Sequence, residues 1–483
     1  MPLGLYISVP FCRTKCSYCN FASDVFSKSA YENYVARLLE DIANSRQLAS
    51  ELECTLGFTH GFTQDDTADS IYLGGGTPSI LDASQLQRIF AGVRDQFTVT
   101  SDAEITVECA PGTLTPALIE TLLQCGVNRV SLGVQSFVDQ EAQSVGRLHK
   151  RSTVLEEIGR LREAGIGNIN IDLIAGLPHQ TAESWAFSVS ETIETGVPHV
   201  SVYMLEIDED SRLGRELIAG GARYHAHFVP DDDATADFYQ QACEMLASAG
   251  IAQYEISNFA RVAPRNGKLQ SNQSRHNLKY WTRQPYLGFG VDAHSMLELV
   301  WGREPSPVQA ERSSAAAGGH RNSEFATAID RIEAERPQAI RFATPDSLDA
   351  YMDREPRTVT PVSTQAAIEE SFFLGLRLNR GIDLEHLRTG SSLGEGYDFN
   401  RATNAAEKTT LAAEATRRRQ QEFSCEPVPA WDSAITQSLR EGLLEQQGTT
   451  VRLTARGRLL SNEVFARFLT EETKVGTGHV NPR

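Results

Sequence analysis

"PFCRTKCSYCNF", residues 10–21, is the stretch of this 483-residue chain that decides how the rest is interpreted. It holds Cys12, Cys16 and Cys19 in a C-x3-C-x2-C spacing, and Phe21 stands two positions after the third cysteine. The other cysteines are scattered singly, as buried small apolar residues usually are. Three thiolates at this spacing can bind three irons of a cubane and leave the fourth iron open to a small chelating ligand.

Two other interpretations of the cysteines are less favoured. A structural zinc ion needs a fourth Cys or His ligand, and residues 1–59 contain no histidine, so that ligand would have to come from a distant segment. Three unrelated buried cysteines are the second alternative. The sequence therefore favours an iron–sulfur cluster held by Cys12, Cys16 and Cys19.

The composition describes an acidic protein with enough apolar residues for a large core. The formal net charge is -18 and 41% of the residues are hydrophobic. This charge argues against a nucleic-acid surface and against adsorption to anionic lipid. No apolar run reaches about 18 residues, and the N-terminus lacks a basic region before an apolar one. We expect a soluble cytoplasmic protein of two domains without an integral membrane segment.

Short β-rich runs alternate with amphipathic segments in the first part of the chain. Asp82 with Gln85 predicts a helix start by a capping box, and Gly126 and Gly165 predict helix ends. Such β–helix repeats predict a parallel sheet covered by helices, here a partial (β/α)6 TIM-type barrel, with a doubly wound open sheet as the alternative. The six expected strands are 5–9, 71–75, 104–108, 129–134, 168–174 and 199–205.

The texture of the sequence changes after about residue 300. We expect the barrel over residues 1–301, a flexible polar insertion over 302–338, and a smaller, mostly helical domain over 339–483. A second polar insertion, 390–423, interrupts that domain. The tail after it reads helix, short β-ribbon, helix, which is typical of a winged-helix arrangement.

Motifs beyond the cysteines extend the pattern. "GGGTPS", residues 74–79, follows the second expected strand, and glycines there let the backbone approach a ligand closely. "CRTKCSYC" resembles the signature loop of the radical S-adenosylmethionine (SAM) superfamily. The resemblance implies a [4Fe-4S] cluster whose open iron is chelated by the amino and carboxylate groups of SAM, and an electron donor for the cluster.

Several polar residues on or after the expected strands fit one ligand site at the carboxyl ends of a parallel sheet. A buried acid satisfied by backbone amides is the alternative for Asp172, and a surface helix residue is the alternative for Arg147. The spacing of the whole set resembles the SAM-binding residues of anaerobic coproporphyrinogen III oxidases and their relatives: Tyr6, Gly75, Gly76, Thr77, Glu108, Gln135, Arg147 and Asp172.

Two groups share this resemblance, the oxygen-independent coproporphyrinogen III oxidases and the HemW-type heme chaperones. The oxidases carry a fourth cysteine where this chain has Phe21, and a long extension before the first strand, where only five residues precede Tyr6 here. "SRHNLKYW", residues 274–281, matches the H-N-x-x-Y-W pattern of the chaperones. Histidine is a good axial ligand of heme iron, so His276 is the first candidate ligand and His294 the second.

The resemblance therefore favours a heme chaperone that binds the cluster, SAM and heme, and delivers heme to respiratory hemoproteins. A radical decarboxylase of coproporphyrinogen III is the alternative, and a barrel that uses SAM and cluster only structurally is a third class. A homodimer is possible at the level of the family. His225 and His227 in "RYHAHF" have a spacing seen in metal ligands, but a solvated turn is the favoured interpretation.

Overall fold

The computed structural model describes residues 2–48, 67–265, 268–298, 339–388 and 430–469. These residues form two compact units. Unit 1 comprises Met1–Tyr280 and Gln284–Ala367, and unit 2 comprises Trp281–Arg283 and Ile368–Arg483. The polar insertions expected at 302–338 and 390–423 lie outside the described residues. Among the described helices, none combines the length and the apolar character needed to cross a membrane.

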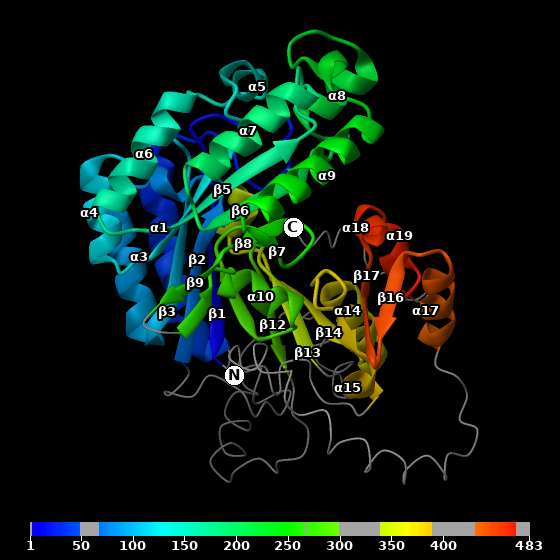
Figure 1. Cartoon of the computed structure of the whole chain (residues 1–483). Coiled ribbons are helices and arrows are strands. Elements are labelled where there is room, and N and C mark those ends of the chain that lie inside the picture. Colours follow the sequence, from blue (N-terminus) through cyan, green and yellow to red (C-terminus); the bar gives the residue numbers. More distant parts are fainter. Residues whose placement is uncertain (1, 49–66, 266–267, 299–338, 389–429, 470–483) are drawn as a thin grey trace, which may run out of the picture. The chain divides into compact units, whose positions relative to one another are not determined.

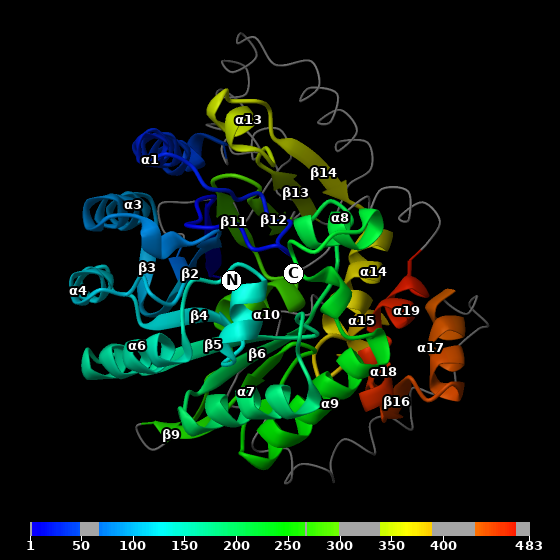
Figure 2. The ribbon, with the colours of Figure 1, turned by 90° about the horizontal axis from the view of Figure 1, so that it is seen from above.

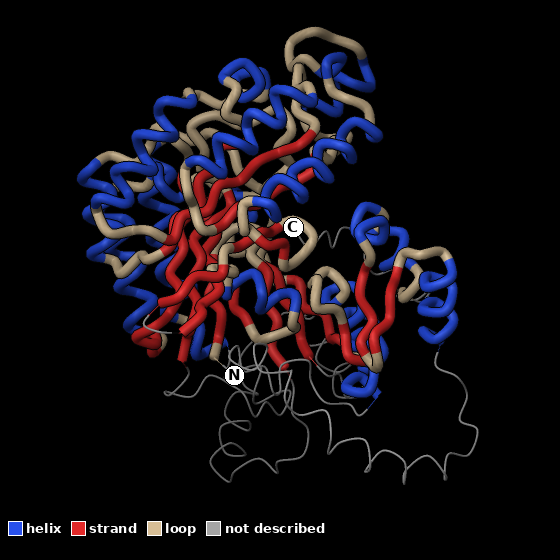
Figure 3. The backbone as a smooth tube through the Cα atoms, in the orientation of Figure 1, coloured by secondary structure: helices blue, strands red, loops and turns tan. Residues whose placement is uncertain are grey.

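Unit 1 is built on one twelve-stranded sheet whose middle strands are parallel and follow the chain in order (Figures 1 and 3). The six expected strands are confirmed. Sequential order excludes the doubly wound alternative, in which the strand order reverses at a switch point. The six are β1 (Leu3–Val9), β2 (Thr67–Gly75), β3 (Thr98–Cys109), β4 (Arg129–Gln135), β5 (Asn168–Ala175) and β6 (His199–Met204).

Helices cover the outer face of this sheet, and Figure 2 shows the strands curving around a common interior. Two expected features of the helices are confirmed: Asp82 and Gln85 form a reciprocal capping box, and Gly126 and Gly165 take positive φ angles just after helix ends. The outer helices are α1 (Lys28–Ala43), α3 (Ala83–Gln96), α4 (Pro116–Gln124), α6 (Arg151–Glu163), α7 (Ala182–Glu194) and α9 (Asp232–Ser248).

Alternation along the parallel strands separates an apolar outer layer from a polar interior. Because successive side chains of a strand point to opposite faces, Val130 and Leu132 face the helices while Ser131 faces the interior. The outward residues are fully buried, so the barrel wall is stabilised mainly by apolar burial against the helices. The interior is free to hold polar side chains: Ser70, Thr106, Ser131, Asn170 and Ser201.

The sheet continues beyond the six parallel strands, which leaves the barrel open. On the β1 side follow β11 (Tyr286–Phe289), β12 (His294–Glu298), β13 (Ala339–Ala343) and β14 (Thr358–Val362). On the β6 side follow β8 (Asn258–Ala260) and β7 (Ala252–Gln253). Since β13 and β14 pair with this sheet, residues 339–367 belong to unit 1, and the boundary expected at 339 is corrected to 367.

Shorter elements complete unit 1. They are η1 (Pro78–Ile80), α5 (Asp139–Ser144), α8 (Arg212–Ala219), η2 (Ala226–Phe228), β9 (Val262–Arg265), β10 (Lys268–Ser271), α10 (Arg275–Trp281) and α13 (Leu348–Met352). The helix α14 (Thr364–Gly375) begins in unit 1 and ends in unit 2.

Unit 2 shows the helix, β-ribbon, helix order that the tail of the sequence predicted. Its core includes the ring of Phe372, stacked on Phe468 at a centroid distance of 4.4 Å and tilted against Trp431 at 5.2 Å. A three-stranded sheet has the order β15-β17-β16. The elements are β15 (Ile382–Asp383), α15 (Leu384–Arg388), α17 (Ala430–Arg440), β16 (Leu444–Gln447), β17 (Thr450–Leu453), α18 (Ala455–Leu459) and α19 (Ser461–Ala466).

Candidate functional site

The three clustered cysteines lie in the loop between β1 and α1, at the carboxyl end of the first strand. Cys12 and Cys16 are buried, Cys19 is half-buried, and all three are free thiols. Backbone hydrogen bonds fix the loop, from the Cys12 N–H to the Asp24 carbonyl at 2.9 Å and from the Ser17 N–H to the Val145 carbonyl at 3.2 Å. The sequence-predicted ligands are therefore brought to one anchored loop.

Burial raises the pKa of the Cys12 and Cys19 thiols above the ordinary value. Only thiolates bind metal, so a positive metal centre is needed to keep these buried groups ionised. Two other features also favour the thiolate of Cys12: the hydrogen bond from Thr77 Oγ1 at 3.8 Å and the nearby charge of Arg147. The donor set thus fits an iron–sulfur cluster.

The glycine-rich turn after β2 packs directly against the cysteine loop. The Gly76 N–H donates to the Val9 carbonyl at 2.8 Å, and the Thr77 N–H donates to the Phe11 carbonyl at 2.7 Å. A Cβ at position 76 would lie 2.6 Å from the Phe11 carbonyl oxygen, so only glycine allows this approach. The cysteine loop after β1 and the glycine-rich turn after β2 therefore form one continuous surface.

Two carboxyl groups face the interior of the barrel below that surface. The Tyr72 hydroxyl donates to Glu108 Oε1 at 2.8 Å. The carboxylate of Asp172 accepts from the Ser131 hydroxyl at 3.0 Å and from the Asn170 amide at 2.8 Å. Asp172 is therefore held by side chains, and the alternative of an acid satisfied by backbone amides is not what the structure shows.

Burial shifts the titration of both acids. It raises the pKa of Glu108 to about 8, and the charge of Asp172 acts in the same direction. It also raises the pKa of Asp172, against the effect of the hydroxyls and the amide that hydrogen-bond to it. A ligand that brings a positive charge or hydroxyl donors to these groups would favour their ionised forms.

Raising the pH from about 5 to 8 is expected to lower the free energy of unfolding of the cluster-free chain. Glu108 has a folded pKa of about 8 against an ordinary 4.5, so the folded chain binds more protons than the unfolded chain between these values. Stability therefore falls as pH rises, by up to about 1.4 kcal/mol per pH unit from this group. Urea unfolding at several pH values should show that the free energy of unfolding of Glu108→Gln depends less on pH than that of the unaltered chain. Equal pH dependence in both chains would contradict a raised pKa of Glu108.

Gln135 and Arg147 carry polar atoms that the protein itself leaves without partners. Within the described residues, Gln135 Oε1 and Arg147 Nε are buried and accept or donate no hydrogen bond. Gln135 also has a φ angle of 69°, a strained backbone position that is frequent at binding sites. A polar ligand at the barrel mouth would satisfy both atoms.

Arg147 lies in the loop between α5 and α6, so the alternative of a surface helix residue is not observed. A Cβ on Gly133 would lie 2.5 Å from Arg147 Nη2, so the missing side chain on β4 makes room for the guanidinium. Burial lowers the pKa of Arg147, but the nearby Cys16 and Asp172 raise it. The positive charge of Arg147 therefore balances negative charge on these two groups.

His276 lies at the other end of the strands from the cysteine loop and is buried. Its Nδ1 is 3.1 Å from the Ser70 hydroxyl and its Nε2 is 2.8 Å from the Tyr280 hydroxyl. The centroid of the His276 ring lies 5.3 Å from that of Tyr72, on which it stacks, and 6.3 Å from that of Tyr6. Tyr6 therefore faces the same barrel interior as His276. Burial lowers the pKa of His276 to about 3. Since both nitrogens have partners, iron ligation would require one of these bonds to break.

The second candidate histidine has a different setting. His294 begins β12, its side chain is 63% exposed, and its Nε2 lies 3.6 Å from the Asp292 carboxylate. It therefore shares no environment with His276.

A chain of buried polar side chains in the barrel interior is not among the sequence-based predictions. His199 is fully buried, with Nδ1 2.6 Å from the Asn170 amide oxygen and Nε2 2.9 Å from the Tyr254 hydroxyl. Arg129, 1% exposed, is the largest charged residue of this interior. The signal was present in "RVSLGV", where Arg129 and Ser131 take alternate positions of a strand whose other positions are apolar.

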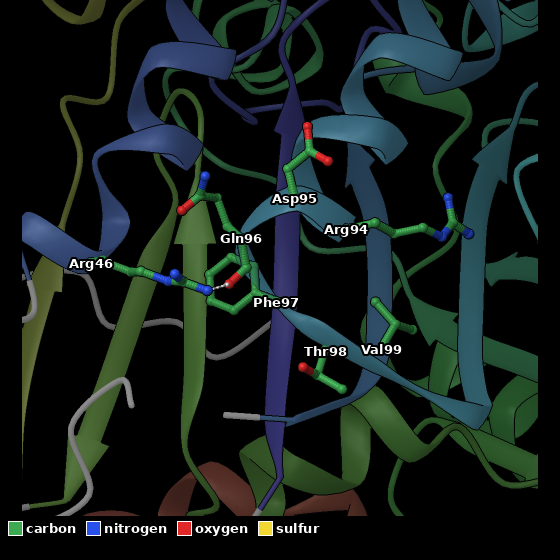
Figure 4. A pocket seen from close by; sticks show the side chains of 7 residues that line it. All are labelled: Arg46, Arg94, Asp95, Gln96, Phe97, Thr98 and Val99. Atoms are coloured by element: carbon green, nitrogen blue, oxygen red, sulfur yellow. Dashed lines mark hydrogen bonds between the residues drawn. The ribbon is translucent and has the colours of Figure 1, made fainter. Parts of the chain in front are cut away.

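A cavity of about 390 Å³ lies where the end of α3 leads into the start of β3, and Arg46, from the segment after α1, also lines it (Figure 4). Arg46 donates to the Gln96 carbonyl at 2.8 Å, as Figure 4 shows, and Arg94 donates to the Cys125 carbonyl. Both guanidinium groups therefore cap backbone carbonyls. This cavity is not continuous with the cysteine loop.

Comparison with known proteins gives one family. Residues 6–189 match the family described as the radical SAM superfamily. The chain is 33% identical over 303 residues to the heme chaperone HemW of Escherichia coli K12, covering 62% of this chain and 72% of that protein. It is 28% identical to the heme chaperone HemW of Lactococcus lactis, over 98% of both chains.

Among solved structures, the chain resembles the coproporphyrinogen III oxidase HemN of Escherichia coli, described as a radical SAM enzyme. The TM-score is 0.66 at 20% identity, and the match covers 97% of this chain and 90% of that one. Identity at this level shows a shared fold. The partial barrel that was expected from the β–helix repeats is thus confirmed.

Proposed function

The chain belongs to the HemW family of the radical SAM superfamily, and from this premise we propose that it is a heme chaperone which binds a [4Fe-4S] cluster, SAM and heme and passes heme to respiratory hemoproteins. The observation that carries the proposal is its identity of 33% to a heme chaperone over 72% of that protein. The cysteine loop and the unpartnered polar atoms beside it support the cofactor part of the proposal.

Cys12, Cys16 and Cys19 would hold the cluster, because they are free thiols on one anchored loop. When bound, the cluster supplies an open metal corner for the amino and carboxylate groups of SAM and a source of one electron. The chain's own residues bind and orient the ligand. The set proposed for SAM is Tyr6, Gly75, Gly76, Thr77, Glu108, Gln135, Arg147 and Asp172.

Each part of that set has a distinct task. The turn at Gly76 offers backbone groups at close range, and the carboxylates of Glu108 and Asp172 accept hydrogen bonds from hydroxyl or ammonium groups. Gln135 Oε1 and Arg147 Nε gain the partners that they lack in the free chain. A cytoplasmic location, an electron donor for the cluster and a homodimer stay predictions.

The oxidase alternative shares the fold but has less support from the residues. The structural match to the coproporphyrinogen III oxidase is at 20% identity, which carries the architecture alone. Phe21, 44% exposed, occupies the position of the oxidase's fourth cysteine. The chaperone is therefore the function that we test first.

Anaerobically reconstituted protein titrated with hemin is expected to give a shifted Soret band and about one heme per chain that stays bound through gel filtration. The same preparation, reduced and supplied with SAM and coproporphyrinogen III, is expected to form no protoporphyrinogen, with the Escherichia coli oxidase as the positive control. Loss of the heme on the column would remove the chaperone function. Formation of protoporphyrinogen would establish the decarboxylase instead.

A further inference from the structure

A second cavity, of about 430 Å³, lies beside the cysteine loop. It is formed by α8 and the loop that follows it. The Leu213 N–H donates to the Ser17 carbonyl at 2.8 Å and the Arg212 guanidinium donates to the Lys15 carbonyl at 3.2 Å, so α8 is attached to that loop. The lining residues are Arg212, Arg215, Glu216, Gly220, Arg223 and Tyr224.

The lining carries three arginines whose charges are not paired. In the part of the chain that the structure describes, no carboxylate lies within ion-pair distance of Arg212, Arg215 or Arg223. Glu216 is engaged elsewhere, because its carboxylate accepts from the Tyr224 N–H at 2.8 Å and the Ala226 N–H at 3.1 Å. In a chain of net charge -18, this cluster is a local site for anionic groups.

Histidines and an exposed aromatic ring adjoin the arginines. The ring centroids of His179 and His225 are 5.0 Å apart. The ring centroid of Phe228 lies 4.0 Å from that of His179 and 4.1 Å from that of His227. Phe228 is 47% exposed. His225 directly follows Tyr224 of the cavity lining. The fold thus joins residues from the loop after β5 to residues after α8.

The imidazole nitrogens of this cluster are available to a ligand. Unlike His276, the side chains of His179, His225 and His227 make no hydrogen bond to any residue that the structure describes. Burial lowers the pKa of His179, with a smaller effect of the two neighbouring histidines, and neutral imidazole is the form that ligates metals.

We propose that this surface is the heme docking site: His225 ligates the iron, Phe228 and Tyr224 lie against the macrocycle, and the arginines Arg212, Arg215 and Arg223 receive the two propionates. The inference rests on the proposed heme-chaperone function and names the site at which it acts. Binding exchanges a water or hydroxide on the iron for an imidazole, with no change in oxidation state.

Heme fits these residues better than other anions do. A metalloporphyrin presents a metal that takes imidazole, a flat apolar face, and two carboxylates that arginine binds in bidentate fashion. Inorganic phosphate would use the arginines but neither the imidazoles nor Phe228. A bare metal ion is not favoured, because no group of three His, Cys, Asp or Glu among the described residues could hold one.

Hemin titration of two variants tests the two halves of the site. In the triple variant His179→Ala, His225→Ala, His227→Ala, we expect affinity to fall about tenfold or more and the Soret band to move toward that of free hemin. In Arg215→Gln, Arg223→Gln, we expect a similar fall in affinity with the Soret position kept, because the iron ligand is untouched. Arg88→Gln, which changes an exposed arginine elsewhere, should match the unaltered chain.

Esterified heme gives a second measurement. Heme dimethyl ester should bind the unaltered chain more weakly than hemin. The double arginine variant should distinguish the two ligands less than the unaltered chain does, since Arg212 is the one proposed propionate contact that it keeps. Cluster iron should be the same in all variants, which shows that they fold.

The outcomes separate the two proposals. If the unaltered chain retains hemin and the triple variant keeps its affinity and spectrum, the docking site is wrong while the chaperone function stands. If the unaltered chain retains no hemin, both are overturned.

Discussion

Reconstitution of the Cys16→Ser variant with iron and sulfide is expected to leave less than about one iron per chain, against about four in the unaltered chain. Cys16 is 8% exposed in a loop fixed by backbone hydrogen bonds, so no other thiol can replace it. Serine keeps the size of the side chain but is a poor ligand for iron at neutral pH. Iron and sulfide analysis together with the visible charge-transfer absorption measures the loss.

Cys125→Ser is the matched control for that variant. Cys125 is also buried, at 3% exposure, and it caps the end of α4 away from the cysteine loop. Its variant should therefore hold the full complement of iron. Equal iron in both variants, or zinc in place of iron in the unaltered chain, would overturn the assignment of the cluster ligands.

Much of unit 1 could be predicted because its strands carry their own signals. The six parallel strands are short runs of β-branched and apolar residues between capped helices, and each was found at its expected place. β13 and β14 were not assigned to the barrel. "AIRFA" and "TVTPV" are five-residue segments whose strand state depends on antiparallel pairing with β12 and with each other, which no local pattern encodes.

The residues of the candidate site could be predicted where each lies on, or just after, a strand that the sequence itself indicates. Glu108 and Asp172 were found because acids on buried strands stand out from apolar neighbours. The environment of His276 was predictable only in part. Tyr280 follows His276 by four residues on α10, the spacing at which helix side chains meet. Its hydroxyl forms a hydrogen bond with one of the two ring nitrogens of His276.

The histidine cluster could not be predicted, because its members are distant in the sequence. His225 and His227 look like a solvated turn when taken alone. Only the fold brings His179, from the loop after β5, to within 5.0 Å of His225. The same holds for Gly133. Its lack of a side chain matters only because the fold brings the guanidinium of Arg147, from the loop after α5, against it.

Gly76→Ala is expected to lower the free energy of unfolding by about 1–3 kcal/mol and to weaken SAM binding by about tenfold or more. The added Cβ would lie 2.6 Å from the Phe11 carbonyl oxygen and 2.8 Å from that of Val9, and neither backbone atom can swing away as a side chain can. The turn must move, which breaks the hydrogen bonds that join it to the cysteine loop. Urea unfolding and SAM titration of reconstituted protein measure the two effects.

Gly159→Ala separates this steric cause from a general effect of replacing glycine. Gly159 lies in α6 with nothing within 4 Å of the Cβ position, so alanine should raise the free energy of unfolding by about 0.5–1 kcal/mol through its better helix propensity. SAM affinity and cluster iron should not change. Opposite signs for the two glycines would place the constraint at the contact between the turn and the cysteine loop, whereas a Gly76→Ala chain that binds SAM normally would show that the two motifs act independently.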